Sequence, residues 1–264
     1  MKICCLVKEV PDAAVQKRID PNTKRLDRSG EKNLNPFDTH GIEAAMQIRE
    51  GGNAEVDEIV AVTMGPDSAV RALHKAVALG ADRSVHLTDG ALEGSDVCAT
   101  GYALAKLLES ESPDLVLLGQ QSDDGECYTI GAVVADHLKM PSLTQVIKID
   151  VEDGKLVCER QAEYGYDTVE VDLPAVISVG DAINEPRYPS LKAIMGAKKK
   201  QLDTKGAGDV GIEADKVGAD GSKTTVEGIN PPPEKEAGEI IEDEDTNETV
   251  EKIVSWLEER KLLA

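Results

Sequence analysis

The first half of the chain alternates short aliphatic runs with longer stretches of helical periodicity. The aliphatic runs, each apolar almost throughout, are residues 3–8, 58–64, 84–88 and 114–119. A strand that is covered on both faces has this composition, because both of its sides lie in a core. Strands of this kind that alternate with helices are typical of a doubly wound, mostly parallel sheet. We therefore expect a Rossmann-like α/β fold.

Three helices between these strands have recognisable start and stop signals. The expected helices are 38–50 with Pro36 in its first turn, a second from Pro66 to residue 79, and a third from Asp96 to about residue 110. Proline suits a first helical turn and aspartate suits a cap. Glycine follows the first two helices, at Gly51 and Gly80, and ends them.

Beyond residue 141 the pattern becomes that of an added β-hairpin. Two runs with strand character, 146–151 and 155–159, flank Asp153-Gly154, a dipeptide typical of a tight hairpin turn. Residues 168–173 predict another strand, and residues 174–179 predict a final buried strand. We expect this final strand to end the α/β domain at about residue 185.

Residues 201 to about 245 differ in composition, being rich in glycine, proline and acidic side chains. Such a stretch cannot bury enough apolar surface to order itself alone. A helix is expected from about Thr246, with Val250, Ile253, Val254 and Leu257 on one face. Either this helix folds back on its own domain, or residues 201–264 form an arm that embraces a partner.

Residues 186–200 combine features of a docking surface. Pro186 and Pro189 hold the backbone between them extended. After them, Leu191, Ile194 and Met195 follow helical spacing and would share one face, with lysines around it. The alternative is a connecting loop whose apolar residues pack on their own domain.

The charge of the chain narrows the classes of partner. Its 264 residues carry a formal net charge of −21, which opposes binding to nucleic acids or anionic membrane surfaces. No apolar run is long enough to cross a bilayer, and the N-terminal run meets Lys8 and Glu9 too early for a signal peptide. We expect a cytoplasmic protein. The five cysteines form no Cys-x-x-Cys pair, so we expect neither a disulfide nor a metal site.

A ligand site is expected where the strand order of the sheet switches, at the carboxyl ends of its strands. The loop after the fourth strand is bracketed by glycines and leads into a helix, so its backbone N–H groups suit a phosphate. The Gly-x-Gly-x-x-Gly motif is absent, which argues against an ordinary Rossmann dehydrogenase. The candidate nucleotide-binding residues are Leu6, Asn35, Pro36, Phe37, Asp38, Met64, Gly119, Gln120, Gln121, Ser122, Asp123, Asp124, Gly125, Glu126, Cys127, Tyr128, Thr129 and Ile130.

Several ordered motifs resemble one family. Asn184-Glu185-Pro186-Arg187-Tyr188, followed by Leu191, Ile194-Met195 and a lysine run, resembles the signature of the electron-transfer flavoprotein β subunit. Gly80-Ala81-Asp82-Arg83, Gly94-Ser95-Asp96 and the order of the four candidate nucleotide segments match the same family. The resemblance covers most of the chain and is vaguest over residues 201–245.

This resemblance implies partners and a role. It implies a heterodimer with an α subunit that carries FAD, held by the C-terminal arm. The dimer would carry electrons between flavoprotein dehydrogenases, such as acyl-CoA dehydrogenases, and other carriers such as ferredoxin or flavodoxin. The residues that it implies for docking are Arg187, Tyr188, Leu191, Ile194, Met195, Lys198, Lys199 and Lys200.

The resemblance also leaves two candidates for the bound nucleotide. Conventional β subunits hold a structural AMP, whereas those of electron-bifurcating complexes hold a second FAD that oxidises NADH. Asp124-Gly125-Glu126 follows the bifurcating pattern, Asp-Gly-Asp, while Cys127 is familiar from the AMP type and Tyr128 replaces an alanine. We expect FAD, with AMP as the alternative. The segment 161–166 departs from the family pattern, so no redox-tuning role is transferred to it.

Catalytic machinery is not evident in the sequence. The four histidines are scattered, and no Gly-x-Ser-x-Gly motif occurs, so we expect no stand-alone activity. A rival of another class is an adenine-nucleotide-binding regulatory protein, which would need neither the docking segment nor the arm. A self-sufficient NADH dehydrogenase would need a substrate pocket that nothing in the sequence marks.

Overall fold

The computed structural model describes residues 1–264 except 153, 231–232, 234–237, 239, 241–244 and 264. The chain divides into two compact units, residues 1–227 and residues 228–264, which we describe one at a time.

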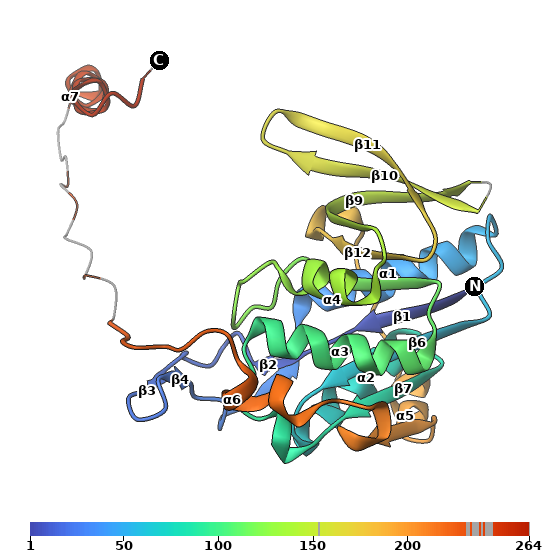
Figure 1. Cartoon of the computed structure of the whole chain (residues 1–264). Coiled ribbons are helices and arrows are strands. Elements are labelled where there is room, and N and C mark those ends of the chain that lie inside the picture. The colour runs from blue at the N-terminus through green and yellow to red at the C-terminus, as the bar shows by residue number, and fades with distance from the viewer. Residues whose placement is uncertain (153, 231–232, 234–237, 239, 241–244, 264) are drawn as a thin grey trace. The chain divides into compact units, whose positions relative to one another are not determined.

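A nine-stranded sheet forms the centre of the first unit in the part of the chain that the structure describes, with strand order β11-β10-β9-β12-β8-β1-β6-β7-β13 (Figure 1). Its strands are β1 (Lys2–Leu6), β6 (Glu58–Met64), β7 (Arg83–Leu87), β8 (Leu115–Gly119), β9 (Ser142–Glu152), β10 (Lys155–Ala162), β11 (Gly165–Asp172), β12 (Ala175–Val179) and β13 (Leu202–Lys205). Pairing is parallel from β9 through to β13 and antiparallel from β9 to β11. The predicted α/β fold with a mostly parallel sheet is confirmed.

Shorter elements connect these strands. The helices of the first unit are α1 (Pro36–Gly51), α2 (Val70–Leu79), α3 (Val97–Glu111), α4 (Ile130–Leu138), α5 (Leu191–Ala197) and α6 (Gly218–Gly221). Single 3₁₀ turns span Asp67–Ala69, Gly90–Leu92, Asp181–Ile183, Gly208–Val210 and Ala214–Lys216. Two small antiparallel pairs are β2 (Glu9–Pro11) with β5 (Lys32–Leu34) and β3 (Ile19–Asp20) with β4 (Arg25–Leu26).

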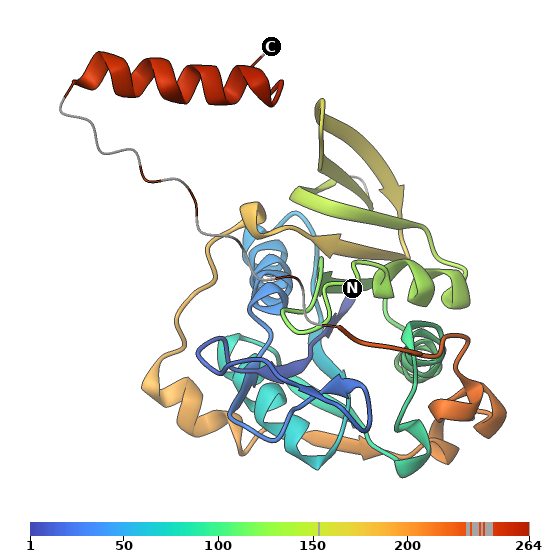
Figure 2. The same ribbon diagram turned by 90° about the vertical axis from the view of Figure 1, so that its left-hand side faces the viewer.

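Helices cover both faces of the parallel part of the sheet. Figures 1 and 2 show α1 and α2 on one face, and α3 and α4 on the other. Ile42 of α1 and Leu73 of α2 are fully buried in one core cluster, while Leu107 of α3 and Val134 of α4 are fully buried in the other. The aliphatic side chains that pattern the sequence therefore fill two layers, one on each side of the strands.

The strand order reverses next to β1. The chain passes from β1 to β6 and β7 on one side, then returns to place β8 and β12 on the other. Loops that follow β1 and β8 therefore leave the sheet in opposite directions, which opens a crevice at their carboxyl ends. This crevice is the ligand position that the sequence predicts.

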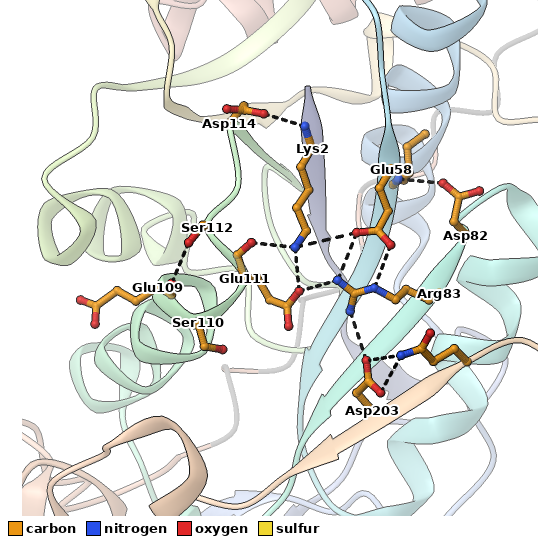
Figure 3. Close-up of polar contacts among 12 residues, drawn as sticks. Lys2, Glu58, Asp82, Arg83, Glu109, Ser110, Glu111, Ser112, Asp114 and Asp203 are labelled. Atoms are coloured by element: carbon orange, nitrogen blue, oxygen red, sulfur yellow. Dashed lines mark hydrogen bonds and ion pairs between the residues drawn. The ribbon is translucent and has the colours of Figure 1, made fainter.

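The sheet extends further than expected into the acidic C-terminal region. Residues 202–205, expected not to order by themselves, form β13 and pair in parallel with β7. Ion pairs fix this edge: Arg83 of β7 contacts Asp203 of β13 at 3.3 Å (Figure 3), and Lys205 contacts Glu111 at 3.1 Å. The pairing with β7 and these ion pairs stabilise the strand. Its own composition therefore did not reveal it.

Glu111 is the centre of this ion-pair network. Its side chain is only 7% exposed and accepts hydrogen bonds from Lys2 at 3.0 Å, Arg83 at 2.5 Å and Lys205 at 3.1 Å. Burial alone would raise the pKa of Glu111, but these three cations outweigh it and lower the pKa to about 2. The network therefore joins the amino ends of β1 and β7, together with β13, to the last turn of α3.

In the second unit, α7 spans Thr246–Glu259 and begins after the capping residue Asp245, as expected. Val250, Ile253 and Val254 are exposed by 52%, 45% and 39%. None of the described helices in either unit combines the length and apolar character needed to cross a membrane. All five cysteines are free thiols.

Candidate functional site

Residues 119–130 follow β8 at the switch point of the sheet, and we call them the nucleotide-binding loop after the role that the sequence predicts for them. It begins at Gly119, where a Cβ would lie 2.5 Å from the backbone carbonyl carbon of Phe37. Only glycine permits this close approach between the end of β8 and the start of α1. The sequence-predicted segments that begin at Asn35 and Gly119 are therefore in direct contact.

Asn35 fastens the nucleotide-binding loop to α1. It precedes α1 but does not cap that helix with its side chain. Instead, its Nδ2 donates to Gln121 O at 2.8 Å, and its Oδ1 accepts from Asp123 N at 3.1 Å. The residue is fully buried, so this pair of bonds sets the path of the loop.

Asp38 joins three segments beneath the loop. Its carboxylate accepts from the backbone N–H of Lys8 at 2.8 Å and from that of Gly119 at 3.3 Å. Burial raises the pKa of Asp38 to about 7, although its hydrogen bonds oppose the shift. The end of β1, the first turn of α1 and the end of β8 thus meet at one carboxyl group.

Asp124 fixes the nucleotide-binding loop through two ion pairs. Its side chain is fully buried between Lys8 Nζ at 2.7 Å and Arg28 Nη2 at 2.7 Å. Lys8 also donates to Ser122 Oγ at 3.1 Å. Burial would raise the pKa of Asp124, but the two cations outweigh it and lower the pKa. One buried carboxylate therefore fixes two basic side chains beside the loop.

Two of the basic residues at this site were missed by sequence reasoning. Arg28 binds Asp124, and Lys17 binds the side chain of Asp123 at 2.9 Å. Both come from the excursion between β2 and β5, which has no hydrophobic periodicity to place it. The available signal was a local cluster of basic residues in an acidic chain: Lys17, Arg18, Lys24, Arg25 and Arg28.

The far side of the loop offers groups to a ligand. Residues 125–129 are exposed, and Glu126 and Tyr128 have left-handed φ values of 46° and 55°, which side chains other than glycine rarely adopt. Thr129, which precedes α4, makes no side-chain cap, so the first N–H groups of α4 are open to an anion. Among the described residues, the buried Gln121 Oε1 has no hydrogen-bond donor. An adenine nucleotide fits these groups, because its phosphate can accept and its amine or hydroxyls can donate.

The other predicted nucleotide-binding residues lie around this loop. Leu6 is buried near the end of β1, and Met64 is half-buried at the end of β6, the neighbouring strand. Phe37 is half-buried, whereas Pro36 and Cys127 are exposed. Of these residues, Phe37 is in close contact with the start of the loop, at Gly119.

Residues 186–200, which we call the docking segment after their predicted role, present apolar side chains to water. Exposure reaches 95% for Tyr188, 80% for Leu191, 48% for Ile194 and 76% for Met195. Helix α5, which carries the last three, is capped by Ser190 and buries Ala197 alone. These residues therefore do not pack on their own domain in the described structure. Lys198, Lys199 and Lys200 follow α5 and are exposed.

Two of the four histidines lie beside backbone carbonyl groups. His86 is buried and lies 2.9 Å from the carbonyl oxygen of Gly65, and His40 lies 3.1 Å from that of Asn184. Within the described residues, no group of three or more histidine, cysteine, aspartate or glutamate side chains could hold a metal ion.

Comparison with known proteins identifies the family. Residues 23–209 match the electron transfer flavoprotein domain. The chain is 40% identical over 265 residues to the electron transfer flavoprotein subunit beta of Mycobacterium tuberculosis, covering 99% of both chains. It is 38% identical to the subunit of the same name from Thermoanaerobacterium thermosaccharolyticum and 36% identical to the caffeyl-CoA reductase-Etf complex subunit CarD of Acetobacterium woodii, covering all of each chain. The chain therefore belongs to the electron transfer flavoprotein β-subunit family, whose function is electron transfer.

Proposed function

We propose that the chain is the β subunit of a heterodimeric electron-transfer flavoprotein, acts in the cytoplasm, and binds FAD in the crevice between β1 and β8. The observation that carries the proposal is the nucleotide-binding loop, which offers open N–H groups and an unpaired buried oxygen on Gln121. FAD bound there would accept hydride from NADH and support electron bifurcation. The protein residues contribute binding and orientation.

Gly125 supports FAD over AMP. A Cβ at this position would lie 3.1 Å from Ser122 Oγ and 3.8 Å from Lys8 Nζ. An acidic side chain there would therefore crowd the loop and compete with Asp124 for Lys8. Glycine leaves that space open, which suits a ligand larger than a mononucleotide.

AMP remains the second candidate because of Cys127, a residue that resembles the AMP type. The two candidates differ in stoichiometry, since one adenine site holds a single nucleotide. Purified heterodimer should release about two FAD per αβ pair and little AMP on denaturation. Release of one FAD and one AMP would refute bifurcation and retain the family role. Release of ATP or AMP without FAD from a monomer would support a regulatory nucleotide-binding protein.

The docking segment is the proposed contact with partner dehydrogenases. Its exposed apolar group, Tyr188, Leu191 and Met195, suits an apolar pocket on the partner, and Lys198 to Lys200 suit acidic groups around that pocket. A flavoprotein dehydrogenase such as an acyl-CoA dehydrogenase is the proposed partner, with ferredoxin or flavodoxin as the acceptor of low-potential electrons. The name of the Acetobacterium woodii relative places that protein in a complex with a reductase.

The second unit is the proposed contact with the α subunit. Val250, Ile253 and Val254 are half-exposed on α7, and burial on a partner would remove them from water. Deleting residues 240–264 should weaken association with the α subunit, measured by titration of the two purified chains. Thermal unfolding of the truncated chain serves as the control, and unchanged affinity would refute this role.

A further inference from the structure

Arg187 behaves differently from its neighbours in the docking segment. Tyr188 beside it is 95% exposed and Leu191 is 80% exposed, whereas the Arg187 side chain is 34% exposed and turns toward α1. A residue that contacts a partner directly would be expected to present its charged group to water. The guanidinium group of Arg187 is instead occupied within its own domain.

Two carboxylates of α1 grip this guanidinium group. Arg187 Nε and Nη2 donate to the two oxygens of Glu43 at 2.6 and 3.0 Å, and Nη1 and Nη2 donate to those of Glu50 at 2.7 and 2.9 Å. The backbone N–H of Arg187 also donates to Glu43 at 3.3 Å. Residues seven apart on a helix lie on the same face, so Glu43 and Glu50 form a preorganised pair. The fork geometry of arginine fits both carboxylates at once, which lysine could not do.

Burial of Glu43 makes loss of this ion pair costly. The Glu43 side chain is only 7% exposed, so loss of its cation would leave a buried charge without compensation. The two carboxylates raise the pKa of Arg187 still further, so it stays charged. Asn184 adds a second attachment, because its Nδ2 donates to the carbonyl oxygen of His40, also on α1, at 3.0 Å.

The other end of the docking segment is fixed differently. Ala197 is 4% exposed at the end of α5, which packs against α2. Between Arg187 and Ala197, no apolar side chain of the segment is buried in the described structure. Full hydrophobic burial therefore fixes this stretch only at Ala197, and the ion pairs of Arg187 fix its other end.

We propose that Arg187 is a positioning residue, which clamps the docking segment to α1 so that Leu191 and Met195 are held in water in the geometry that a partner binds. This rests on the proposed docking function. Without the clamp, the segment samples other conformations, and the partner captures only the competent fraction. The loss appears in KM for the partner, while kcat and flavin content stay the same.

The test compares Arg187→Ala, Glu43→Gln and the double variant in the purified heterodimer, with an acyl-CoA dehydrogenase as the probe. Each single variant should raise KM for the dehydrogenase at least fivefold, with kcat and released flavin within twofold of the parent. The double variant should be no worse than the more impaired single one, because both changes break the same contact. Arg187→Lys should restore only part of the loss. Arg71→Ala, on the exposed surface of α2, is the matched control.

Hydrogen exchange supplies a second readout that needs no partner. Amides of residues 188–197 should exchange at least tenfold faster in Arg187→Ala than in the parent, and Glu50→Gln gives a milder variant if Arg187→Ala folds poorly. Unchanged exchange would overturn the clamp. So would a normal KM in Glu43→Gln beside a raised KM in Arg187→Ala, because Arg187 would then contact the partner itself. If Leu191→Ala leaves KM unchanged, the docking function fails, while exchange still decides the clamp.

Discussion

The nucleotide-binding loop and the docking segment are each fixed by a charged side chain between two opposite charges, and the signs of the charges are reversed between the two segments. In the loop, the anion Asp124 lies between the cations Lys8 and Arg28. In the docking segment, the cation Arg187 lies between the anions Glu43 and Glu50. Each segment is therefore attached to the domain by one charged side chain that two opposite charges hold.

The two segments differ in what they leave unsatisfied. Around Asp124 the open groups are polar, namely the N–H groups at the start of α4 and the oxygen of Gln121. Beyond Arg187 the open groups are apolar, with Leu191 and Met195 mostly in water. Unpaired polar groups favour a small ligand that supplies hydrogen bonds, and exposed apolar groups favour a protein surface. The comparison therefore favours a different kind of partner for each segment.

The largest expected effect concerns the stability of the fold and should leave the function of both segments unchanged. Glu111→Gln removes the carboxylate at the centre of the ion-pair network and should lower the free energy of unfolding by about 3 kcal/mol at pH 7, roughly a hundredfold in the unfolding equilibrium. Because the pKa of Glu111 is lowered from 4.5 to about 2, its stabilisation is complete above about pH 4.5 and is lost as the pH falls toward 2.

Denaturant titrations at several pH values check this prediction. The control is Glu109→Gln, whose side chain is 48% exposed and pairs only with Lys106 among the described contacts, so it should cost less than ~0.5 kcal/mol. Nucleotide content and partner KM should not change in either variant while the protein is folded. An equal effect of the two substitutions at pH 7 would remove the special role of Glu111.

Leu191→Ala tests the apolar half of the comparison. Truncation of an anchor that enters a partner pocket should cut electron delivery to the dehydrogenase by on the order of tenfold or more, as about 1.4 kcal/mol per decade implies. Reduction of the bound flavin by NADH should stay near the parent rate. Stopped-flow reduction followed by titration with the dehydrogenase measures both steps, and parental transfer at sub-saturating partner would count against docking by this segment.

Gly125→Asp tests the polar half. The new carboxylate would sit beside Lys8 and Ser122, fill the space next to the loop and repel phosphate. The ratio of FAD to AMP released from this site should fall about tenfold, which corresponds to about 1.4 kcal/mol. Gly208→Asp adds the same charge where a Cβ meets nothing within 4 Å, and it should leave the ratio unchanged. Equal ratios in both variants would show that Gly125 does not select the nucleotide.

The smallest expected effect concerns the lysines that follow α5. Replacing Lys198, Lys199 and Lys200 by alanine should slow encounter with the dehydrogenase a few-fold at low salt, because exposed charges steer association. The difference should vanish as salt shortens the screening length to about 3 Å at 1 M. Association rates at several salt concentrations measure it, and a loss that persists at high salt would indicate direct contacts instead.

Sequence patterns located the strands and helices that bury aliphatic side chains. Residues 58–64 and 114–119 were predicted within a residue because all positions but the terminal ones are buried in a core. Strand β13 was missed because Gln201-Leu202-Asp203-Thr204-Lys205 carries no such pattern. Its order depends on Arg83, which is 120 residues away in the sequence, and no local rule pairs residues at that distance.

The candidate site likewise has features that sequence patterns predict and features that they do not. The glycine-bracketed loop after β8 could be located from topology, since ligand positions in parallel sheets follow strand order. The partners of Asp124 could not, because Arg28 comes from an irregular excursion that hydrophobic periodicity does not describe. The same limit applies to Arg187, because only the fold shows that Glu43 and Glu50 lie beside its side chain.

Helix α1 contacts both segments, and its length fixes the distance between the two points of contact. Asn35, just before its first turn, holds the nucleotide-binding loop, and Glu43 and Glu50 hold Arg187. At 1.5 Å per residue, these carboxylates lie about 12 and 22 Å along the helix axis from Asn35. Electron tunnelling weakens steeply with distance, and a rigid helix keeps that distance constant from one encounter to the next. A partner that binds at Leu191 would therefore meet the nucleotide at a spacing set by the number of turns in α1.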